Sequence, residues 1–261
     1  MFKKDRKDFE SKWDDLQIFV QYGVLSDEKF ADRAKKYTLF KNTEGEYFTI
    51  DEYKDKVSPV QTDKDEKVVC LYTNDTEAHY SYVKAAKERG YDVLELSGPL
   101  SSHLISKLEQ SNENMTFARV DADTLDKLIK KTDEIPSKLS KEQEEKLKEI
   151  FEDCVNKEKF TIQFESLSES EGPVMVTQPE FMRRMMEQQK LGGGGMMGAF
   201  PEMFNMVVNS NHPNVMAILS KRGQNKKNTA KTMTDLALLS NGMLKGQDLS
   251  KFIERTVGLI N

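Results

Sequence analysis

Apolar residues recur at helical spacing at the start of the chain. They are separated by four, three and four positions, at Phe9, Trp13, Leu16 and Val20. This spacing puts them on one face of a helix, which Gly23 is predicted to end. Ser26 is predicted to cap the next helix, because a serine side chain can accept a hydrogen bond from a free backbone N–H.

A third short helix is predicted after a turn at 42–46. Thr49 and Glu52 have the spacing of a capping box, in which each side chain bonds to the other residue's backbone N–H. Residues 1–58 are therefore expected to form a compact helical unit, followed by a polar linker at 59–66.

Beyond this linker, short β-branched runs alternate with helical stretches. Strands are predicted at 67–73, 91–96 and 116–120, with helices at 77–89 and 101–109 between them. Because strands separated by helices usually lie parallel, residues 59–135 are expected to form a small α/β layer. No glycine-rich phosphate loop follows the first strand, so we do not expect a nucleotide site in this layer.

Residues 136–261 mix the two patterns. Ser140 and Gln143 can start a helix, 160–164 alternates as a strand, and 174–177 is predicted to be its hairpin partner. Helices are predicted at 201–208, 215–219, 232–239 and 249–260. The predicted fold class is therefore α+β and α/β: a helical unit, a small α/β layer, and an α+β C-terminal domain ending in a helical hairpin.

A methionine-rich segment at 179–200 stands out in this last part. Its apolar residues follow helical spacing and then continue beyond four glycines at 192–195, which we expect to be mobile. A methionine stripe is most often part of a core, but the glycine run favours an adaptable contact surface. The candidate contact residues are Phe181, Met182, Met185, Met186, Met196, Met197 and Phe200.

The final two predicted helices carry apolar faces near the end of the chain. These faces are formed by Leu236, Leu239, Phe252, Ile253, Val257 and Ile260. They can pack on the chain's own core, or meet the same hairpin of a second copy in a four-helix bundle. The pattern alone leaves both alternatives open.

Composition excludes several classes of protein. The net charge of −5 argues against nucleic-acid binding, which requires a basic surface. No apolar run is long enough for a transmembrane helix, and the first residues lack the apolar core of a signal peptide. Two distant cysteines, Cys70 and Cys154, indicate buried thiols in a reducing compartment, so we expect a cytoplasmic protein.

Candidate catalytic and metal-binding groups are sparse. His79, His103 and His212 are far apart and share no metal-ligand spacing. Paired acids such as Asp14 and Asp15 lie in charge-dense helices and are interpreted as solvated faces. We therefore expect no catalytic residue, metal or cofactor in this chain.

Several stretches, in this order, resemble the ninety-kilodalton heat-shock chaperone family in its bacterial form. They are KDFESKWDDLQIFVQYGVLSDEKF, FTIDEYKDKV with KVVCLYTND, PVMVTQPEFMRRMMEQQ, NSNHPNVMAIL and DLALLSNGMLKGQDLSKFIERTVGLI. One departs from the family pattern: the Asn-Pro-x-His turn appears here in the order His212-Pro213. The resemblance extends over nearly the whole chain.

The resemblance implies the back half of an ATP-driven homodimeric clamp. It identifies 1–58 and 59–135 as the end of the middle domain, 136–261 as the C-terminal dimerisation domain, and 179–200 as the segment that contacts unfolded client proteins. The family's ATP and Mg²⁺ site belongs to an N-terminal domain not represented here. Implied partners are a second copy, client proteins and other chaperones, without nucleic acid or membrane.

Two other classes of function are weighed against this one. The chain could be a purely structural dimerisation module without client contact, or a small-molecule enzyme that uses the α/β layer. Solvent exposure of Met182, Met185 and Met186 distinguishes a client-binding surface from a structural module.

Overall fold

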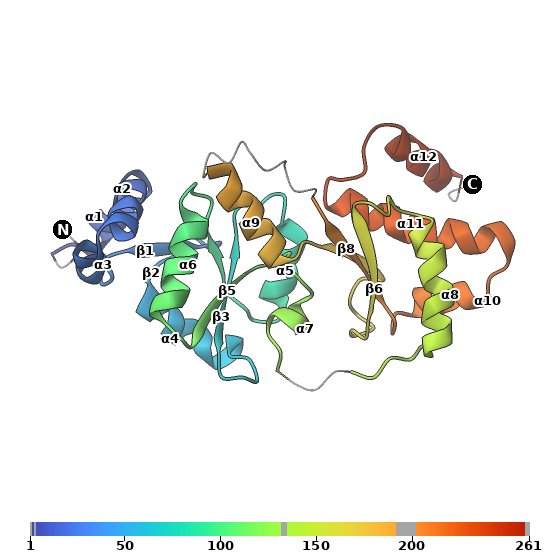
Figure 1. Cartoon of the computed structure of the whole chain (residues 1–261), viewed down its shortest axis with the longest axis horizontal. Coiled ribbons are helices and arrows are strands. Elements are labelled where there is room, and N and C mark those ends of the chain that lie inside the picture. The colour runs from blue at the N-terminus through green and yellow to red at the C-terminus, as the bar shows by residue number, and fades with distance from the viewer. Residues whose placement is uncertain (1, 3, 132–134, 192–201, 259–261) are drawn as a thin grey trace. The chain divides into compact units, whose positions relative to one another are not determined.

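The computed structural model describes residues 2, 4–131, 135–191 and 202–258, with side chains left out at 187–191 (Figure 1). Contacts divide the chain into two compact units. Unit 1 comprises Met1–Lys131 and Arg183–Met197, and unit 2 comprises Thr132–Met182 and Gly198–Asn261. The mixed α+β class is confirmed, whereas the division at 58 and 135 into domains stays a prediction.

Unit 1 begins with the helices α1 (Arg6–Ser11), α2 (Trp13–Ser26) and α3 (Glu28–Ala34). The predicted end at Gly23 is wrong, because α2 continues to Ser26. A Cβ at Gly23 would lie 2.6 Å from a ring carbon of Phe30, so this glycine allows close packing of α3 on α2. The cap of α3 is Asp27 rather than Ser26, since the Asp27 side chain accepts from the Phe30 N–H.

Two strands occur inside the segment that was predicted to be helical. β1 (Leu39–Asn42) and β2 (Tyr47–Thr49) form an antiparallel hairpin around the expected turn. The capping box at Thr49 and Glu52 is confirmed and starts α4 (Ile50–Gln61). Since α4 continues through Pro59 to Gln61, the predicted linker at 59–66 is partly wrong.

The alternation of strands and helices predicted for the next segment is confirmed. It consists of β3 (Val68–Thr73), α5 (Tyr80–Glu88), β4 (Val93–Glu95), α6 (Ser101–Ser111), β5 (Met115–Arg119) and α7 (Leu125–Leu128). β3 pairs in parallel with both β4 and β5. The hairpin joins them through β1 and β4, which gives a sheet of order β2-β1-β4-β3-β5.

Apolar side chains fill both faces of this sheet. On one face Cys70, Tyr72 and Phe117 pack with Leu104 and Ile105 of α6. On the other face the cluster consists of Val69, Leu71, Val83, Ala86, Tyr91, Val93, Val120 and Ile129. The fully buried pattern of β3 explains why its sequence is a continuous apolar run rather than an alternating one.

Unit 2 is built around a smaller sheet. Its strands are β6 (Phe160–Glu165), β7 (Val174–Thr177) and β8 (Phe204–Asn209), with β8 in the centre, parallel to β6 and antiparallel to β7. The predicted helix at 201–208 is wrong, because Met206, Val207 and Val208 are fully buried in the central strand. The predicted pairing of 174–177 with 160–164 is also wrong, because β8 lies between them.

Helices complete unit 2. They are α8 (Lys141–Glu152), α10 (Pro213–Ser220), α11 (Gly223–Ser240) and α12 (Gly246–Val257). The capping box of Ser140 and Gln143 at α8 is confirmed. α11 begins at Gly223 rather than at Thr232. The first half of this helix is polar and lies in solvent, so it lacks the apolar spacing from which a helix is predicted, whereas Ala230 and Met233 farther along are buried. None of the described helices is long and apolar enough to cross a membrane.

Candidate functional site

The methionine-rich segment forms α9 (Glu180–Leu191). Phe181, at its start, exposes 75% of its surface, whereas Met182, Met185 and Met186 are half-buried. The methionine face is therefore neither a closed core stripe nor a fully open surface, and its contact with client proteins stays a prediction. Met196, Met197, Phe200 and the glycines at 192–195 lie outside the described residues.

The arginine face of α9 is the more deeply buried one. Arg183 exposes only 4% of its surface, and its guanidinium lies 5.6 Å from the ring centroid of Tyr72 on β3. Arg183 also donates a hydrogen bond to the Tyr72 hydroxyl. Such a cation over an aromatic ring, removed from solvent, stabilises the docked helix. Helical spacing predicts two faces for α9 but not the element that each of them contacts.

Arg184 makes a second attachment to the same unit. Its Nη1 donates to Glu109 Oε2 at 2.7 Å, and its Nη2 donates to the carbonyl oxygen of Phe117 at 2.7 Å. Glu109 belongs to α6 and Phe117 to the edge strand β5, so one side chain joins three elements. Sequence analysis missed both anchoring arginines, because their partners lie far away along the chain.

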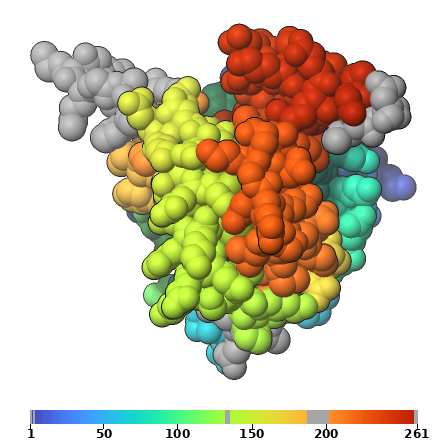
Figure 2. Space-filling model, turned by 90° about the vertical axis from the view of Figure 1, so that its right-hand side faces the viewer, coloured from blue at the N-terminus to red at the C-terminus, as the bar shows by residue number. Residues whose placement is uncertain are grey.

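The helices α11 and α12 form the second candidate surface. Leu236, Leu239, Ile253 and Val257 expose 50%, 41%, 52% and 53% of their surfaces. Figure 2 shows α12 in red beside the orange residues of α11. Large exposed apolar side chains on two helices that contact each other make this hairpin a candidate protein interface. The remaining predicted member, Ile260, lies outside the described residues.

Phe252 differs from those four residues. It exposes only 7% of its surface, and the Arg255 guanidinium lies 5.7 Å from its ring centroid. Phe252 is therefore part of the packing that holds α12 within unit 2, and a charge there would disturb folding before it disturbed an interface. At this degree of burial, a Phe252→Asp variant is expected to unfold unit 2 rather than to give a folded monomer.

An ion pair that sequence analysis missed attaches α12 to α11. Asp235 is 1% exposed, and its two oxygens each lie 2.5 Å from a cation, Lys231 Nζ and Arg255 Nη2. The sequence contains one signal for this pair: Asp235 lies in an apolar stretch, four residues after Lys231, so the two side chains share one face of a helix. Because both cations pair with the buried carboxylate, the hairpin has a defined geometry.

Three residues that are apart in sequence meet at the carboxyl ends of β3 and β5. Thr73 Oγ1 lies 2.9 Å from His79 Nδ1, and His79 Nε2 lies 3.5 Å from Asp121 Oδ2. Arg119 donates to both Asp121 oxygens, at 2.5 and 2.7 Å. Burial lowers the pKa of His79, and this outweighs the opposing effect of the nearby Asp121.

The order hydroxyl, imidazole and carboxylate is also that of a nucleophilic triad. Here, however, Thr73 is fully buried, and its hydroxyl is hydrogen-bonded to the backbone of Asp75. A nucleophile must reach its substrate, and this hydroxyl instead holds the loop between β3 and α5. We interpret the group as a structural network.

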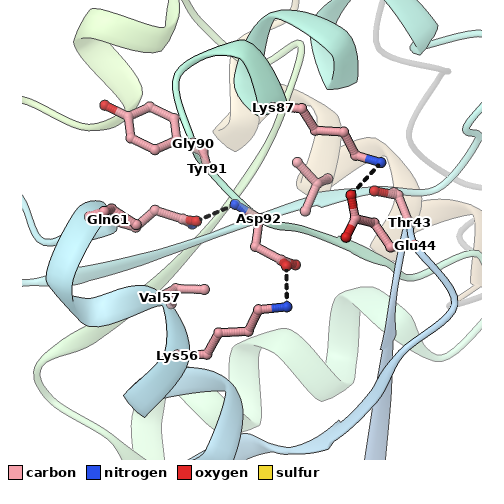
Figure 3. Close-up of a pocket in the computed structure, with 11 residues that line it drawn as sticks. Thr43, Glu44, Lys56, Val57, Gln61, Lys87, Gly90, Tyr91 and Asp92 are labelled. Atoms are coloured by element: carbon pink, nitrogen blue, oxygen red, sulfur yellow. Dashed lines mark hydrogen bonds and ion pairs between the residues drawn. The ribbon is translucent and has the colours of Figure 1, made fainter.

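A pocket of about 250 Å³ lies beside α4 and the start of β4 (Figure 3). Its charged side chains pair with each other: Lys56 with Asp92 at 2.7 Å and Lys87 with Glu44 at 3.5 Å. Gln61 accepts from the Asp92 N–H at 2.6 Å. A ligand would have to displace these bonds, so the pocket does not favour the small-molecule enzyme considered from the sequence.

The two thiols are poorly suited to chemistry. Cys70 is fully buried, and burial raises its pKa to about 12. Cys154 is half-buried, and burial also raises its pKa. Because the thiolate is the reactive form, burial lowers the reactivity of both side chains. Across the described ranges, no group of three or more His, Cys, Asp or Glu side chains has a metal-binding arrangement.

Comparison with known proteins gives the family. The family model described as Hsp90 protein matches residues 1–261. The Chaperone protein HtpG of Porphyromonas gingivalis is 42% identical over 240 residues, which cover 90% of this chain and 35% of that protein. The corresponding proteins of Bacteroides fragilis and Bacteroides thetaiotaomicron are 33% identical over 329 residues, covering 100% of this chain and 48% of each relative.

The chain thus spans about a third to a half of the length of these relatives. The matches to the two Bacteroides proteins cover the whole chain and therefore include both candidate surfaces, the α9 segment and the α11–α12 hairpin. With a family model over its whole length and chaperones among its relatives, the chain belongs to the Hsp90 family and is similar to its bacterial HtpG-type members.

Proposed function

We propose that this chain is the dimerising, client-binding part of an Hsp90-type chaperone. Two copies associate through the exposed face of α11 and α12, and each presents α9 to unfolded segments of client proteins. The observation that carries this proposal is the apolar exposure of these helices, at Leu236, Leu239, Ile253 and Val257 for association and at Phe181 for client contact. The cytoplasm is the proposed compartment, and other chaperones are proposed partners.

Client contact is supported by the chemistry of α9. Phe181 presents an exposed aromatic ring, and the half-buried Met182, Met185 and Met186 add flexible, polarisable side chains on the same helix. Such side chains repack against differently shaped apolar partners, as a protein with many clients requires. The alternative, a structural dimerisation module, needs no exposed Phe181.

ATP and Mg²⁺ are proposed to act in the longer chaperone rather than on any residue named here. The pocket beside α4 is lined by mutually paired charges and carries no glycine-rich phosphate loop among its lining residues. The work assigned to this chain is therefore binding and assembly, with no catalytic step.

Suppression of aggregation by the purified chain tests the proposal. A chemically denatured client protein is diluted into buffer with and without the chain, and light scattering is followed. Reduced scattering by wild type, with less reduction by Phe181→Ser, is the expected result. Equal suppression by wild type and Phe181→Ser would favour the structural module. Phe19→Ser on α2, which removes another exposed phenylalanine, is the matched control.

A further inference from the structure

β5 is one of the two edge strands of the sheet in unit 1, and β2 is the other (Figure 1). Among the described residues β5 pairs only with β3. The even-numbered residues on either side of β5 bond to β3. The Asn114 carbonyl accepts from the Val68 N–H, and the Val120 N–H donates to the Tyr72 carbonyl. Because direction alternates along a strand, the backbone groups of Phe117 point away from the sheet. An edge with free backbone groups is a template for another strand.

Two side chains occupy this position in the structure. The Phe117 N–H donates to Glu109 Oε1 at 2.7 Å, and the Phe117 carbonyl accepts from Arg184 Nη2 at 2.7 Å. Glu109 and Arg184 are themselves joined by an ion pair of 2.7 Å. In an antiparallel sheet, the residue opposite Phe117 would make these same two bonds, one as donor and one as acceptor. The ion pair therefore takes the place of one residue of a neighbouring strand.

The neighbouring edge positions are bonded locally. Met115 N–H donates to Asn112, and the Arg119 carbonyl accepts from Ala122 N–H. Phe117 is thus the position on this edge whose outward-facing backbone groups bond to the side chains of Glu109 and Arg184. Since Arg184 belongs to α9 and Glu109 to α6, movement of α9 away from β5 would free the Phe117 carbonyl and remove the cation that pairs with Glu109. Glu109 Oε1 would keep its bonds from the Phe117 N–H and from Thr116 Oγ1, so an added strand would have to displace these.

The surroundings indicate what kind of strand fits. A residue paired with Phe117 directs its side chain to the same face of the sheet. On that face Phe117 packs with Leu104 and Ile105, and Leu108 is partly buried against the same cluster. An apolar side chain suits this position, and a charged one does not.

We propose that the β5 edge binds an extended apolar segment of unfolded polypeptide as an added antiparallel strand, and that Arg184 of docked α9 and Glu109 of α6 compete for the same backbone groups. This inference rests on the proposed function, because it names how a client segment is held. α9 would then have two roles: its methionine face contacts a client, and its arginine face closes the strand site until α9 moves.

Fluorescence anisotropy with a labelled peptide tests the strand site. The peptide has about eight residues, a typical strand length, with alternating valine and threonine and terminal lysines for solubility. Arg184→Ala should bind it up to about fivefold more tightly than wild type, the upper end of the range for loss of one partly exposed ion pair. Glu109→Gln, which weakens the pair but keeps an oxygen for the Phe117 N–H, should give a smaller gain.

Two controls separate backbone pairing from unspecific binding. Lys107→Ala removes one positive charge from α6, as Arg184→Ala removes one from α9, and should leave peptide affinity unchanged. The same peptide methylated on the backbone nitrogens of one edge should lose the gain, because it cannot donate to the Phe117 carbonyl. Equal binding of methylated and unmethylated peptides, or no gain in Arg184→Ala, would overturn the strand site.

Aggregation assays on the same samples separate this inference from the proposed function. Wild type that suppresses client aggregation, with no peptide gain in Arg184→Ala, would refute the strand site and leave the chaperone function standing. A peptide gain without any suppression by wild type would refute the function and leave the strand site as a property of the sheet. Melting curves of both variants confirm that each is folded.

Discussion

At the scale of single residues, burial separates side chains that look alike in the sequence. Phe252 and Ile253 are adjacent in one apolar pattern, yet the first is 7% and the second 52% exposed. The apolar pattern of α12 could not distinguish them, because burial depends on how α12 packs against α11, which the ion pairs of Asp235 hold in place. The role of each side chain on α12 therefore depends on its packing against α11.

Truncation of these two neighbours should change the stability of unit 2 by very different amounts. Phe252→Ala removes a buried ring and should destabilise unit 2 by about 3–5 kcal/mol. Ile253→Ala should change stability by less than about 1 kcal/mol, because half of the side chain is already in solvent. Urea unfolding of both variants under conditions that keep the chain monomeric measures the difference. Similar losses for the two would mean that Ile253 is covered in the monomer.

His79 should make the stability of unit 1 depend on pH. Burial lowers its pKa below the ordinary 6.5, whereas in the unfolded chain the imidazole recovers that value. As pH falls below about 6.5, the unfolded state binds the proton first, so stability is full above this pH and declines below it. The charged groups facing the ring are Asp121 and Asp75, which raise the pKa, and Arg119 and Arg183, which lower it.

Thermal melts at about pH 7.5 and about pH 5.5 test this dependence. His79→Asn should lose less stability between the two pH values than wild type does. His212, whose pKa is also lowered by burial, remains in both proteins and supplies the same background. An equal loss in wild type and His79→Asn would show that the imidazole is not the group responsible.

At the scale of elements, local signals in the sequence were the ones that predicted structure correctly. The capping boxes of α4 and α8 depend on residues three positions apart, so the chain specifies them without tertiary context. β8 was predicted as a helix because a short apolar run fits either period. Its strand conformation depends on pairing with β6 and β7, whose paired residues are 28 or more positions away.

The candidate surfaces show the same difference between local signals, which the sequence reveals, and contacts between distant residues, which it does not. The apolar residues of α9, α11 and α12 could be named from spacing, because helical periodicity is local. Arg183 and Arg184 could not be assigned, since Tyr72 and Glu109 are 111 and 75 positions away. For the same reason, the sequence identified the methionines of α9 but not the attachment of its arginine face to β3 and β5.

The methionine face of α9 gives a test at this scale. Replacement of Met182, Met185 and Met186 by serine should reduce suppression of client aggregation. Its cost in stability should be below the about 2–5 kcal/mol per residue of a fully buried methionine, since all three are half-buried. Met206→Ser, at a fully buried position of β8, is the matched control and should destabilise strongly. A comparable collapse of the melting temperature in the triple variant would identify the methionines as core.

At the scale of the whole molecule, the proposed function gives the two candidate surfaces complementary roles. Exposed Phe181 on α9 is proposed for client contact, and the four exposed apolar residues of the α11–α12 hairpin are proposed for association. A dimer gives two α9 helices per particle, and two weak contacts on one client bind more tightly than either alone. Association and client binding are therefore coupled in the proposed chaperone.

Breaking the association should weaken client binding without unfolding the chain. Ile253→Asp with Val257→Asp places two carboxylates on the exposed face of α12, where the monomer leaves them in water but a dimer would bury them. The variant should keep the melting profile of a folded chain and suppress client aggregation less well per chain than wild type. Undiminished suppression would mean that one α9 suffices.

Sedimentation velocity of the wild-type chain, compared with Ile253→Asp/Val257→Asp, tests homodimerisation most directly. Wild type is expected to sediment as a dimer whose fraction rises with concentration, and the double variant as a folded monomer. A wild type that remains monomeric at high concentration would contradict association through α11 and α12. A dimer that persists in the folded double variant would place the interface elsewhere on the chain.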